Sequence, residues 1–432
     1  MSTTAALTPT PHTAGPVAAV VTVVSRKTLV IFAVLTAALA ALVLLRGTPG
    51  DATFRLAADT DFFQLPELTI PSVPTAWALT AVCALLTAES LRRYVAKSPT
   101  PGWVVVLFAV AWLAGFLTEE ASGGSLPVVG LLAGSLALAV PLVFGALGGV
   151  LGERAGVVNI AIDGQLLLGA FAAAIVGSST GSPWAGLVAA MLAGALVALV
   201  LGVFAITYLV DQVIVGVVLN VLVIGMTSFL FSQLLAPNAA TLNSPPRFPR
   251  VPIPVLGEVP LIGPIFFRQT MIVYLLYIAV ALVTFALYRT RWGLRVRAVG
   301  EHPKAADTVG IKVNLTRYRT IILAGAIAGM GGAFFTLVSV PQFNREMTGG
   351  AGYIALAAVI FGKWDPIRAT LAALLFGFAS NLQGVLGVLG SRDPLPSQFM
   401  LMLPYVITIV AVAGLVGRSR PPAADGIPYQ KE

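Results

Sequence analysis

The amino-acid sequence predicts an all-α, polytopic integral membrane helical bundle with about 10–12 transmembrane segments, including re-entrant or broken helices. Of its 432 residues, 57% are hydrophobic and only 10% are charged, and the mean hydropathy is +0.92. Soluble domains carry roughly 25% charged residues, so this composition cannot build a surface that faces water. The apolar residues also form long runs, and the charges gather between those runs. Both observations indicate a protein embedded in a bilayer.

A helix needs about 20 apolar residues to cross the hydrocarbon core of a membrane, and apolar runs recur along the whole chain. The first run follows Arg26 and Lys27 and is longer than the apolar part of a signal peptide, which favours a retained helix over a cleaved leader. The predicted segments are 28–45, 75–91, 102–117, 128–150, 157–176, 185–209, 213–235, 269–288, 318–340, 351–362, 367–389 and 399–417.

The predicted segments group into four parts along the chain. Residues 1–27 are expected to be a disordered cytoplasmic N-terminus, rich in Ser, Thr, Ala and Pro. Residues 28–120 are predicted to form an additional N-terminal transmembrane module. Residues 121–417 form the predicted core, which contains a long polar loop at 289–317, and residues 418–432 form a cytoplasmic tail.

Charge placement predicts how the protein lies in the membrane. When the spans alternate sides, the basic clusters around Arg26, Arg92, the 289–319 loop and Arg418 all fall on one side. The opposite side collects acidic residues. By the positive-inside rule, both termini are therefore expected in the cytoplasm, for a multi-pass protein of the cell inner (plasma) membrane.

Two segments do not resemble plain transmembrane spans. Residues 351–362 are too short to cross a bilayer comfortably, and residues 152–164 place glycines, an asparagine and an aspartate where apolar residues are expected. Irregular backbone at membrane depth is tolerated where protein buries it or where it lines a water-filled cavity. Transporters also build substrate sites at broken helices. Both segments are therefore predicted to be half-helices or re-entrant elements.

The sequence offers little material for enzymatic chemistry. It has no phosphate-binding loop, one cysteine (Cys83) and two histidines, and no paired-carboxylate or metal-ligand pattern in the apolar core. No catalytic residue, metal or cofactor is expected. The formal net charge of +8 could suggest a nucleic-acid binder, but the basic residues lie between apolar segments. We therefore expect contact with membrane lipids and no nucleic-acid partner.

A polar segment from Tyr288 to Ile311 is predicted to lie on the cytoplasmic face. Within it, a short helix is expected to begin at Pro303 and to stop at Gly310. Such a helix has the form of a docking element for a soluble partner. An ordinary positive-inside loop is the alternative, and its basic residues do not distinguish the two.

Four stretches of the chain resemble ABC importer permeases of the branched-chain amino acid/simple-sugar superfamily, and together they are most similar to its nucleoside-uptake branch. They are the coupling-helix region Arg297–Ile311, with the stretches Glu153–Gln165, Asp211–Asn220 and Gly352–Pro366. The resemblance covers about residues 125–417 in order. Residues 1–120 depart from it, as does Asp163, where a glutamate is more usual.

The resemblance implies a transmembrane permease subunit of an ATP-driven importer that forms the translocation path by alternating access. Its implied partners are cytoplasmic ATPase subunits, a second permease subunit that is expected to be non-identical, and an external lipoprotein-type substrate-binding protein. The implied substrate is a nucleoside. A permease for simple sugars or branched-chain amino acids is an alternative within the superfamily. An ion-coupled secondary transporter or channel is an alternative from another class, against which the Ala305-Ala306 loop argues.

Polar residues inside the membrane usually face a cavity or a partner, and four of them are candidates for the substrate pathway. Asn159 and Asp163 are spaced so that a helix would place them on one face, and Asp163 could equally cap the helix that follows it. Asn220 could instead bond a neighbouring helix. The candidate pathway residues are Asn159, Asp163, Gln165 and Asn220; the candidate residues for ATPase coupling are Arg297, Glu301, His302, Pro303, Ala305, Ala306 and Gly310. A further pattern of small residues at Gly325–Gly329 predicts close helix packing.

Overall fold

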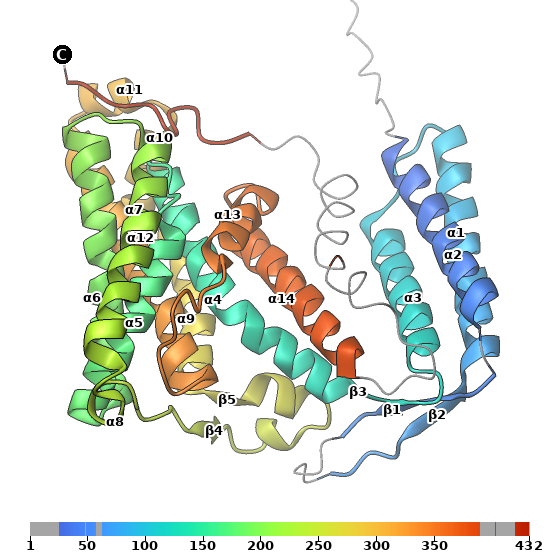
Figure 1. Ribbon diagram of the computed structural model, residues 1–432. Coiled ribbons are helices and arrows are strands. Elements are labelled where there is room, and N and C mark those ends of the chain that lie inside the picture. The colour runs from blue at the N-terminus through green and yellow to red at the C-terminus, as the bar shows by residue number, and fades with distance from the viewer. Residues whose placement is uncertain (1–25, 48, 58–62, 389–401, 403–419, 432) are drawn as a thin grey trace, which may run out of the picture. The chain divides into compact units, whose positions relative to one another are not determined.

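The computed structural model describes residues 26–47, 49–57, 63–388, 402 and 420–431. Within these residues, ten helices are long and apolar enough to cross a membrane, which confirms the predicted helical bundle (Figure 1). They are α1 (Lys27–Arg46), α2 (Ser72–Val95), α3 (Gly102–Glu120), α4 (Val128–Arg154), α5 (Ile162–Thr180), α6 (Pro183–Gly202), α7 (Gln212–Leu230), α9 (Met271–Arg289), α12 (Val313–Phe334) and α14 (Pro366–Val388). Short π-helical turns extend α6, α7 and α12 at their C-terminal ends. The predicted span 399–417 lies, except for Met402, outside the described residues.

The described helices group into two compact units. The first contains most of α1, α2 and α3. In this unit Phe32 stacks on Phe108 with ring centroids 3.8 Å apart, and the Trp112 indole N–H donates to the Leu35 carbonyl at 2.8 Å. The second unit contains the elements from α4 onward together with residues 46–75, so the segment between α1 and α2 belongs with the C-terminal part of the chain.

Short strands occur in the second unit, although the sequence indicated none. They are β1 (Asp51–Arg55), β2 (Leu68–Pro71), β3 (Ser125–Pro127), β4 (Arg250–Pro252) and β5 (Arg268–Thr270). The first three form a sheet in the order β2-β1-β3, in which β2 runs antiparallel and β3 parallel to β1. β4 and β5 pair antiparallel. Strands of three to five residues are too short for an alternating pattern to reveal them.

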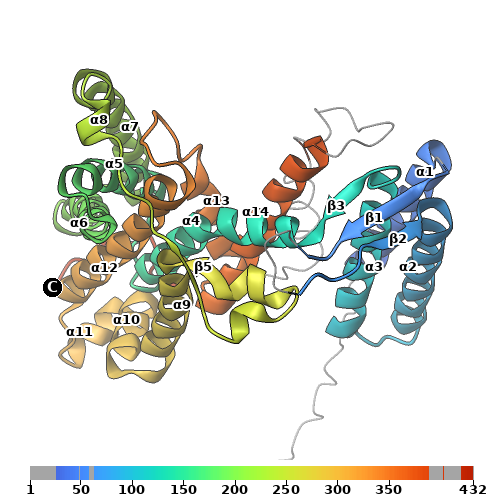
Figure 2. The same ribbon diagram turned by 90° about the horizontal axis from the view of Figure 1, so that it is seen from below.

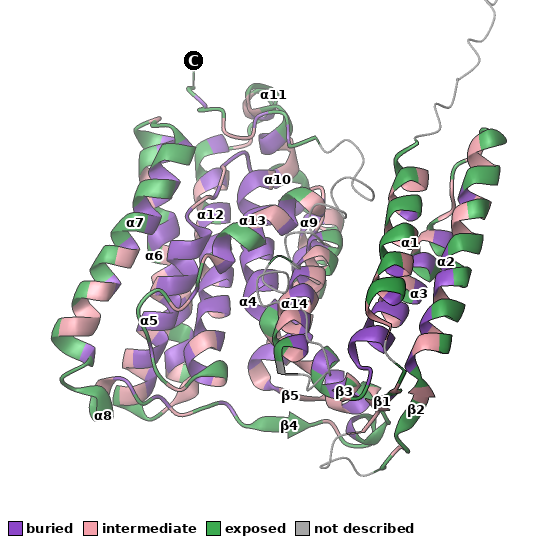
Figure 3. Ribbon diagram, turned by 45° about the vertical axis from the view of Figure 1, so that its right-hand side comes forward, coloured by how far each residue is buried: buried purple, intermediate pink, exposed green. Residues whose placement is uncertain are grey.

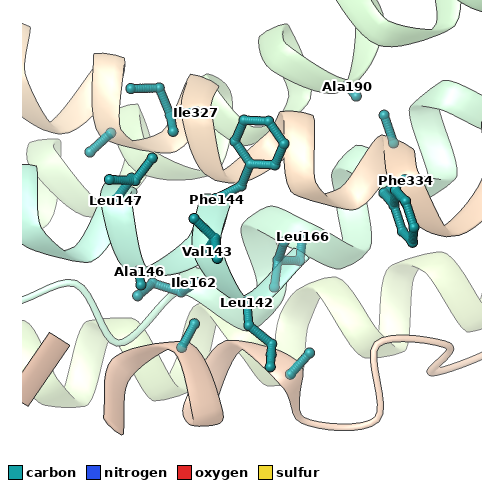
Figure 4. Close-up of a cluster of buried hydrophobic side chains, with 14 of the residues drawn as sticks. Leu142, Val143, Phe144, Ala146, Leu147, Ile162, Leu166, Ala190, Ile327 and Phe334 are labelled. Atoms are coloured by element: carbon teal, nitrogen blue, oxygen red, sulfur yellow. The ribbon is translucent and has the colours of Figure 1, made fainter. Parts of the chain in front are cut away.

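The core of the second unit is built around α4, which contacts α5, α12, α14 and the short helix α13 (Ala351–Phe361). Figure 3 shows that buried residues gather on α4, α5 and α12. Their side chains interdigitate in the cluster of Figure 4, where Phe144, Leu166 and Ile327 come from three different helices. A membrane-spanning helix that is buried on most sides must be apolar all round, as α4 is.

Glycines allow α6 and α12 to approach closely, as the small-residue pattern predicted. A Cβ placed on Gly194 would lie 2.8 Å from the Cα of Gly329, and one placed on Gly329 would overlap the carbonyl oxygen of Ala190. Without a hydrophobic driving force between helices in lipid, such close packing is a main source of helix association. The expected packing role of Gly325–Gly329 is confirmed.

Short helices complete the second unit and lie at the ends of the long helices or between them (Figures 1 and 2). They are α8 (Ala239–Leu242), α10 (Arg291–Glu301), α11 (Pro303–Thr308) and α13. With 11 residues, α13 is only about 16 Å long, so it cannot cross a hydrocarbon core about 30 Å thick. The prediction that residues 351–362 do not form a plain span is confirmed.

Candidate functional site

An irregular connection, residues 155–161, separates α4 from α5. This connection is the break that the sequence predicts. Gly156 adopts φ +81°, a left-handed conformation that L side chains rarely adopt. The Val157 N–H then donates to the Gly152 carbonyl at 3.0 Å and closes the end of α4. The helix predicted over 157–176 therefore begins only at Ile162. This places part of the expected helix in irregular backbone.

Asn159 lies in this connection and pairs with Gln165, which lies in the first turns of α5. The Asn159 Nδ2 donates to Gln165 Oε1 at 3.1 Å, and the Gln165 Nε2 donates to Asn159 Oδ1 at 3.0 Å. Both side chains are fully buried. The expectation that Asn159 shares a helical face with Asp163 is wrong, because the chain is not helical before Ile162. The reciprocal amide pair instead fastens the connection to α5.

Asp163 binds the start of α13, a helix almost two hundred residues further along the chain. Its Oδ1 accepts the Gly352 backbone N–H at 2.9 Å, and its Oδ2 accepts the Thr348 hydroxyl at 3.3 Å. A carboxylate at a helix N-terminus satisfies an unpaired N–H and complements the helix dipole. Asp163 therefore caps α13. The alternative that it caps its own helix is wrong, because α5 has no side-chain cap.

Asn220, in the middle of α7, closes the other side of the break. Its Oδ1 accepts the Gly164 N–H at 2.8 Å, and its Nδ2 donates to the Ile160 carbonyl at 2.9 Å and to the Tyr353 hydroxyl at 3.1 Å. One amide thus binds two backbone groups of the irregular segment and a side chain of α13. The predicted interhelical hydrogen bond of Asn220 is present in the structure.

Sequence reasoning missed three further polar residues near the break. Gln212, at the start of α7, accepts the Val158 N–H at 2.7 Å. Tyr353 is 47% exposed, and its hydroxyl meets Asn220. The buried Glu153 carboxylate accepts the indole N–H of Trp364. A carboxylate at the end of an apolar helix, as at Glu153, is the one sequence signal that could have found a member of this set.

The four candidate pathway residues are brought together in one buried network. Side chains from α5 and α7 bond four backbone groups: the Val158 N–H and the Ile160 carbonyl of the break, the Gly164 N–H of α5 and the Gly352 N–H of α13. Irregular backbone needs such internal hydrogen bonds wherever water cannot reach it. The bonds join the start of α5 and the start of α13 to each other and to the middle of α7.

The polar loop after α9 is more ordered than expected, because residues Arg291–Glu301 form α10. The predicted short helix is present as α11, which starts at Pro303. The chain leaves α11 through Gly310, whose φ of +84° explains why a glycine ends this helix. The expected boundaries of the short helix are confirmed to within one residue.

The expected coupling residues divide into exposed and buried ones. Ala305 and His302 are exposed. Ala306 is only 4% exposed and is buried in a cluster with Tyr429 of the C-terminal segment, residues 420–431. The Glu301 carboxylate accepts the Ala423 N–H at 3.2 Å. The Arg297 guanidinium lies 5.2 Å from the centre of the Tyr288 ring and so has an aromatic partner within this chain.

Residues 131–412 match a protein family that is described as "branched-chain amino acid transport system / permease component". The match covers more than half of the chain and contains both the polar network and α11. The chain belongs to this family of permeases. This membership confirms the family expected from the sequence and removes the ion-coupled alternative. The permease is a multi-pass membrane protein and a transport subunit of an ABC importer.

The permease is similar to three curated relatives along most of their length. It is 42% identical to the guanosine ABC transporter permease protein NupQ of Bacillus subtilis, covering 69% of this chain and 95% of the relative. It is 37% identical to the nucleoside ABC transporter permease protein NupC of Lactococcus lactis, covering 70% and 96%. A putative glucose ABC transporter permease protein of Haloferax volcanii is 35% identical, covering 67% and 92%. No solved structure matches the permease.

The family match begins after the first structural unit of the permease. It starts at residue 131, within α4, so α1, α2 and α3 lie before it. The residues that build the network and the helices α10 and α11 all lie inside it. The family match therefore falls within the second unit, and α1, α2 and α3 lie outside it.

Proposed function

We propose that this permease carries nucleosides as one subunit of an ATP-driven importer. The observation that supports the substrate is the similarity to relatives named for guanosine and for nucleosides, at 42% and 37% identity and over nearly their whole length. The similarity to a putative glucose permease, at 35% identity, makes simple sugars the second candidate. The description of the family makes branched-chain amino acids the third class to compare.

We place the substrate path beside the polar network of the break. A nucleoside offers ribose hydroxyls and base edges for amide hydrogen bonds, and a base that can stack on an aromatic ring. The half-exposed Tyr353 offers an aromatic ring and a hydroxyl, and that hydroxyl is held by Asn220. In this proposal Asn159, Asp163, Gln165 and the buried Asn220 hold the break in shape, and Tyr353 faces the substrate.

We infer that ATPase subunits bind at α11, on the cytoplasmic side of the plasma membrane. The basic residues of the 289–319 loop and of the C-terminal segment support this orientation. The C-terminal segment lies beside α10 and α11 (Figures 1 and 3), as expected if the C-terminus is cytoplasmic. A second, non-identical permease and an external lipoprotein-type binding protein complete the proposed importer.

The proposed substrate class can be tested by measuring uptake in cells that carry the complete importer. Labelled guanosine should accumulate only when this permease is expressed with its ATPase and binding protein, and unlabelled nucleosides should compete. Glucose, ribose and leucine should not compete. Cells that lack only this permease are the control. Competition by a sugar, together with no uptake of guanosine, would establish the sugar candidate instead.

Ala305→Arg should abolish uptake, because it places a long cation on the exposed face of α11 where an ATPase subunit is proposed to pack. Ala305 is replaced alone and Ala306 is left unchanged, because Ala306 is buried in this chain. Asn314→Arg, at an exposed position in the first turn of α12, is the matched control. Both variants should reach the membrane in normal amounts, as measured by immunoblot. Normal uptake by Ala305→Arg would remove α11 from the proposed interface.

A further inference from the structure

The C-terminal segment, residues 420–431, crosses the coupling region and contacts its two short helices. The Ala424 N–H donates to the Gly300 carbonyl at 2.9 Å, at the end of α10. Tyr429 is buried in one small apolar cluster with Val299 of α10 and Ala306 of α11. These contacts fasten the segment to the helices on which ATPase subunits are proposed to act.

The same segment also contacts the connection that leads into the polar network. The Arg317 Nη1 of α12 donates to the Ile427 carbonyl at 3.1 Å. A Cβ placed on Gly156 would lie 3.0 Å from the Ala424 carbonyl oxygen, and one placed on Gly426 would lie 3.3 Å from Val158. The segment therefore lies against the break on one side and against α10 and α11 on the other.

Packing contributes more to the docking of the segment than its charges do. Lys431 and Asp307 form an ion pair of 3.6 Å, but the Lys431 side chain is 72% exposed, and such pairs contribute little. Burial raises the pKa of Asp425, although the Gly426 N–H and the Arg317 charge act to lower it. Burial therefore disfavours the charged form of this carboxyl group. Tyr429, which is 8% exposed, is therefore the contact to test.

We propose that residues 420–431 form a strap that transmits movement of α11 to the connection at Gly156, with Tyr429 as its positioning residue. When an ATPase subunit displaces α11, the buried Tyr429 moves with it, and the backbone from Ala424 to Gly426 moves against the break. Because the same short segment packs against α11 and against the connection, movement of α11 can pass to the connection through contiguous packed groups. The proposal rests on the proposed ATP-driven function, but it does not depend on which substrate is carried.

A cysteine in the connection reports this transmission without any substrate. The native Cys83 is replaced by serine and Val158 by cysteine, and maleimide labelling is followed in the assembled importer with and without a nonhydrolysable ATP analogue. In the parent variant, the nucleotide should change the labelling rate by about tenfold, which is typical of coupling between sites. In Tyr429→Ser, the change should fall to less than about twofold. ATP hydrolysis should continue, and the nucleoside carried for each ATP hydrolysed should fall about tenfold.

Ile427→Ala is the matched control, because the Ile427 side chain is 53% exposed and only its backbone carbonyl contacts Arg317. It should behave as the parent in every measurement. A labelling change that persists in Tyr429→Ser would overturn the strap. So would dissociation of the ATPase subunits from that variant, since the segment would then support docking rather than transmission. If the labelling rate of the parent variant changes with the ATP analogue but the importer carries no nucleoside, the proposed substrate is wrong and the strap proposal still holds.

Discussion

Replacing Gly352 by alanine is expected to abolish uptake. A Cβ at this position would overlap the backbone nitrogen and Cα of Asp163 and lie 2.6 Å from its Cβ. These are main-chain atoms of α5 that cannot turn aside as a flexible side chain would. The substitution would also break the hydrogen bond between the Gly352 N–H and Asp163. Overpacking and the lost bond together cost about 3–5 kcal/mol.

Gly225→Ala is the control for this prediction, because a Cβ on Gly225 in α7 would meet no atom within 4 Å. Alanine in a helix interior is favoured over glycine by about 1 kcal/mol, so this variant should transport normally. Immunoblots of membrane fractions and guanosine uptake measure both variants. Normal uptake by Gly352→Ala would show that α13 can separate from α5 without consequence, and the proposed role of the break would be wrong.

Asn159→Leu is expected to reduce uptake about tenfold, because it leaves the Gln165 amide buried without its partner, at a cost of about 1–3 kcal/mol. The two side chains are fully buried and bond only each other among the hydrogen bonds of the described residues. Leucine has as many side-chain heavy atoms as asparagine and the same branching at Cγ, so the loss should come mainly from the unsatisfied amide. Uptake kinetics, with the amount of assembled importer measured in parallel, test this expectation.

The double variant Asn159→Leu with Gln165→Leu distinguishes a structural pair from a substrate contact. Replacing both partners of a buried hydrogen bond by apolar groups of similar shape can be nearly neutral. If the amides serve only to fasten the connection to α5, the double variant should recover most of the uptake that the single variant lost. A double variant that assembles normally but does not transport would place these amides in contact with the substrate.

The sequence by itself determined the class of this protein and the position of most of its elements. Apolar runs set the spans, because a bilayer demands an uninterrupted apolar length. Local chemistry set the ends of α11, since Pro303 suits a first helical position and Gly310 suits the left-handed turn beyond it. The break near Asn159 was also predictable, because polar and glycine residues there interrupt an apolar pattern. Each of these signals depends only on neighbours along the chain.

Only the tertiary structure decided what the polar side chains bind. Asp163 was equally suited to capping its own helix, and the structure gives it to α13, 189 residues away. Ala306 was predicted to act in ATPase coupling with Ala305, but it is buried in a cluster with Tyr429, from the far end of the chain. Hydrogen-bond and packing partners depend on proximity in the folded protein, where residues distant in sequence can lie as close as near ones. A pattern along one sequence contains no information on which distant residues become neighbours.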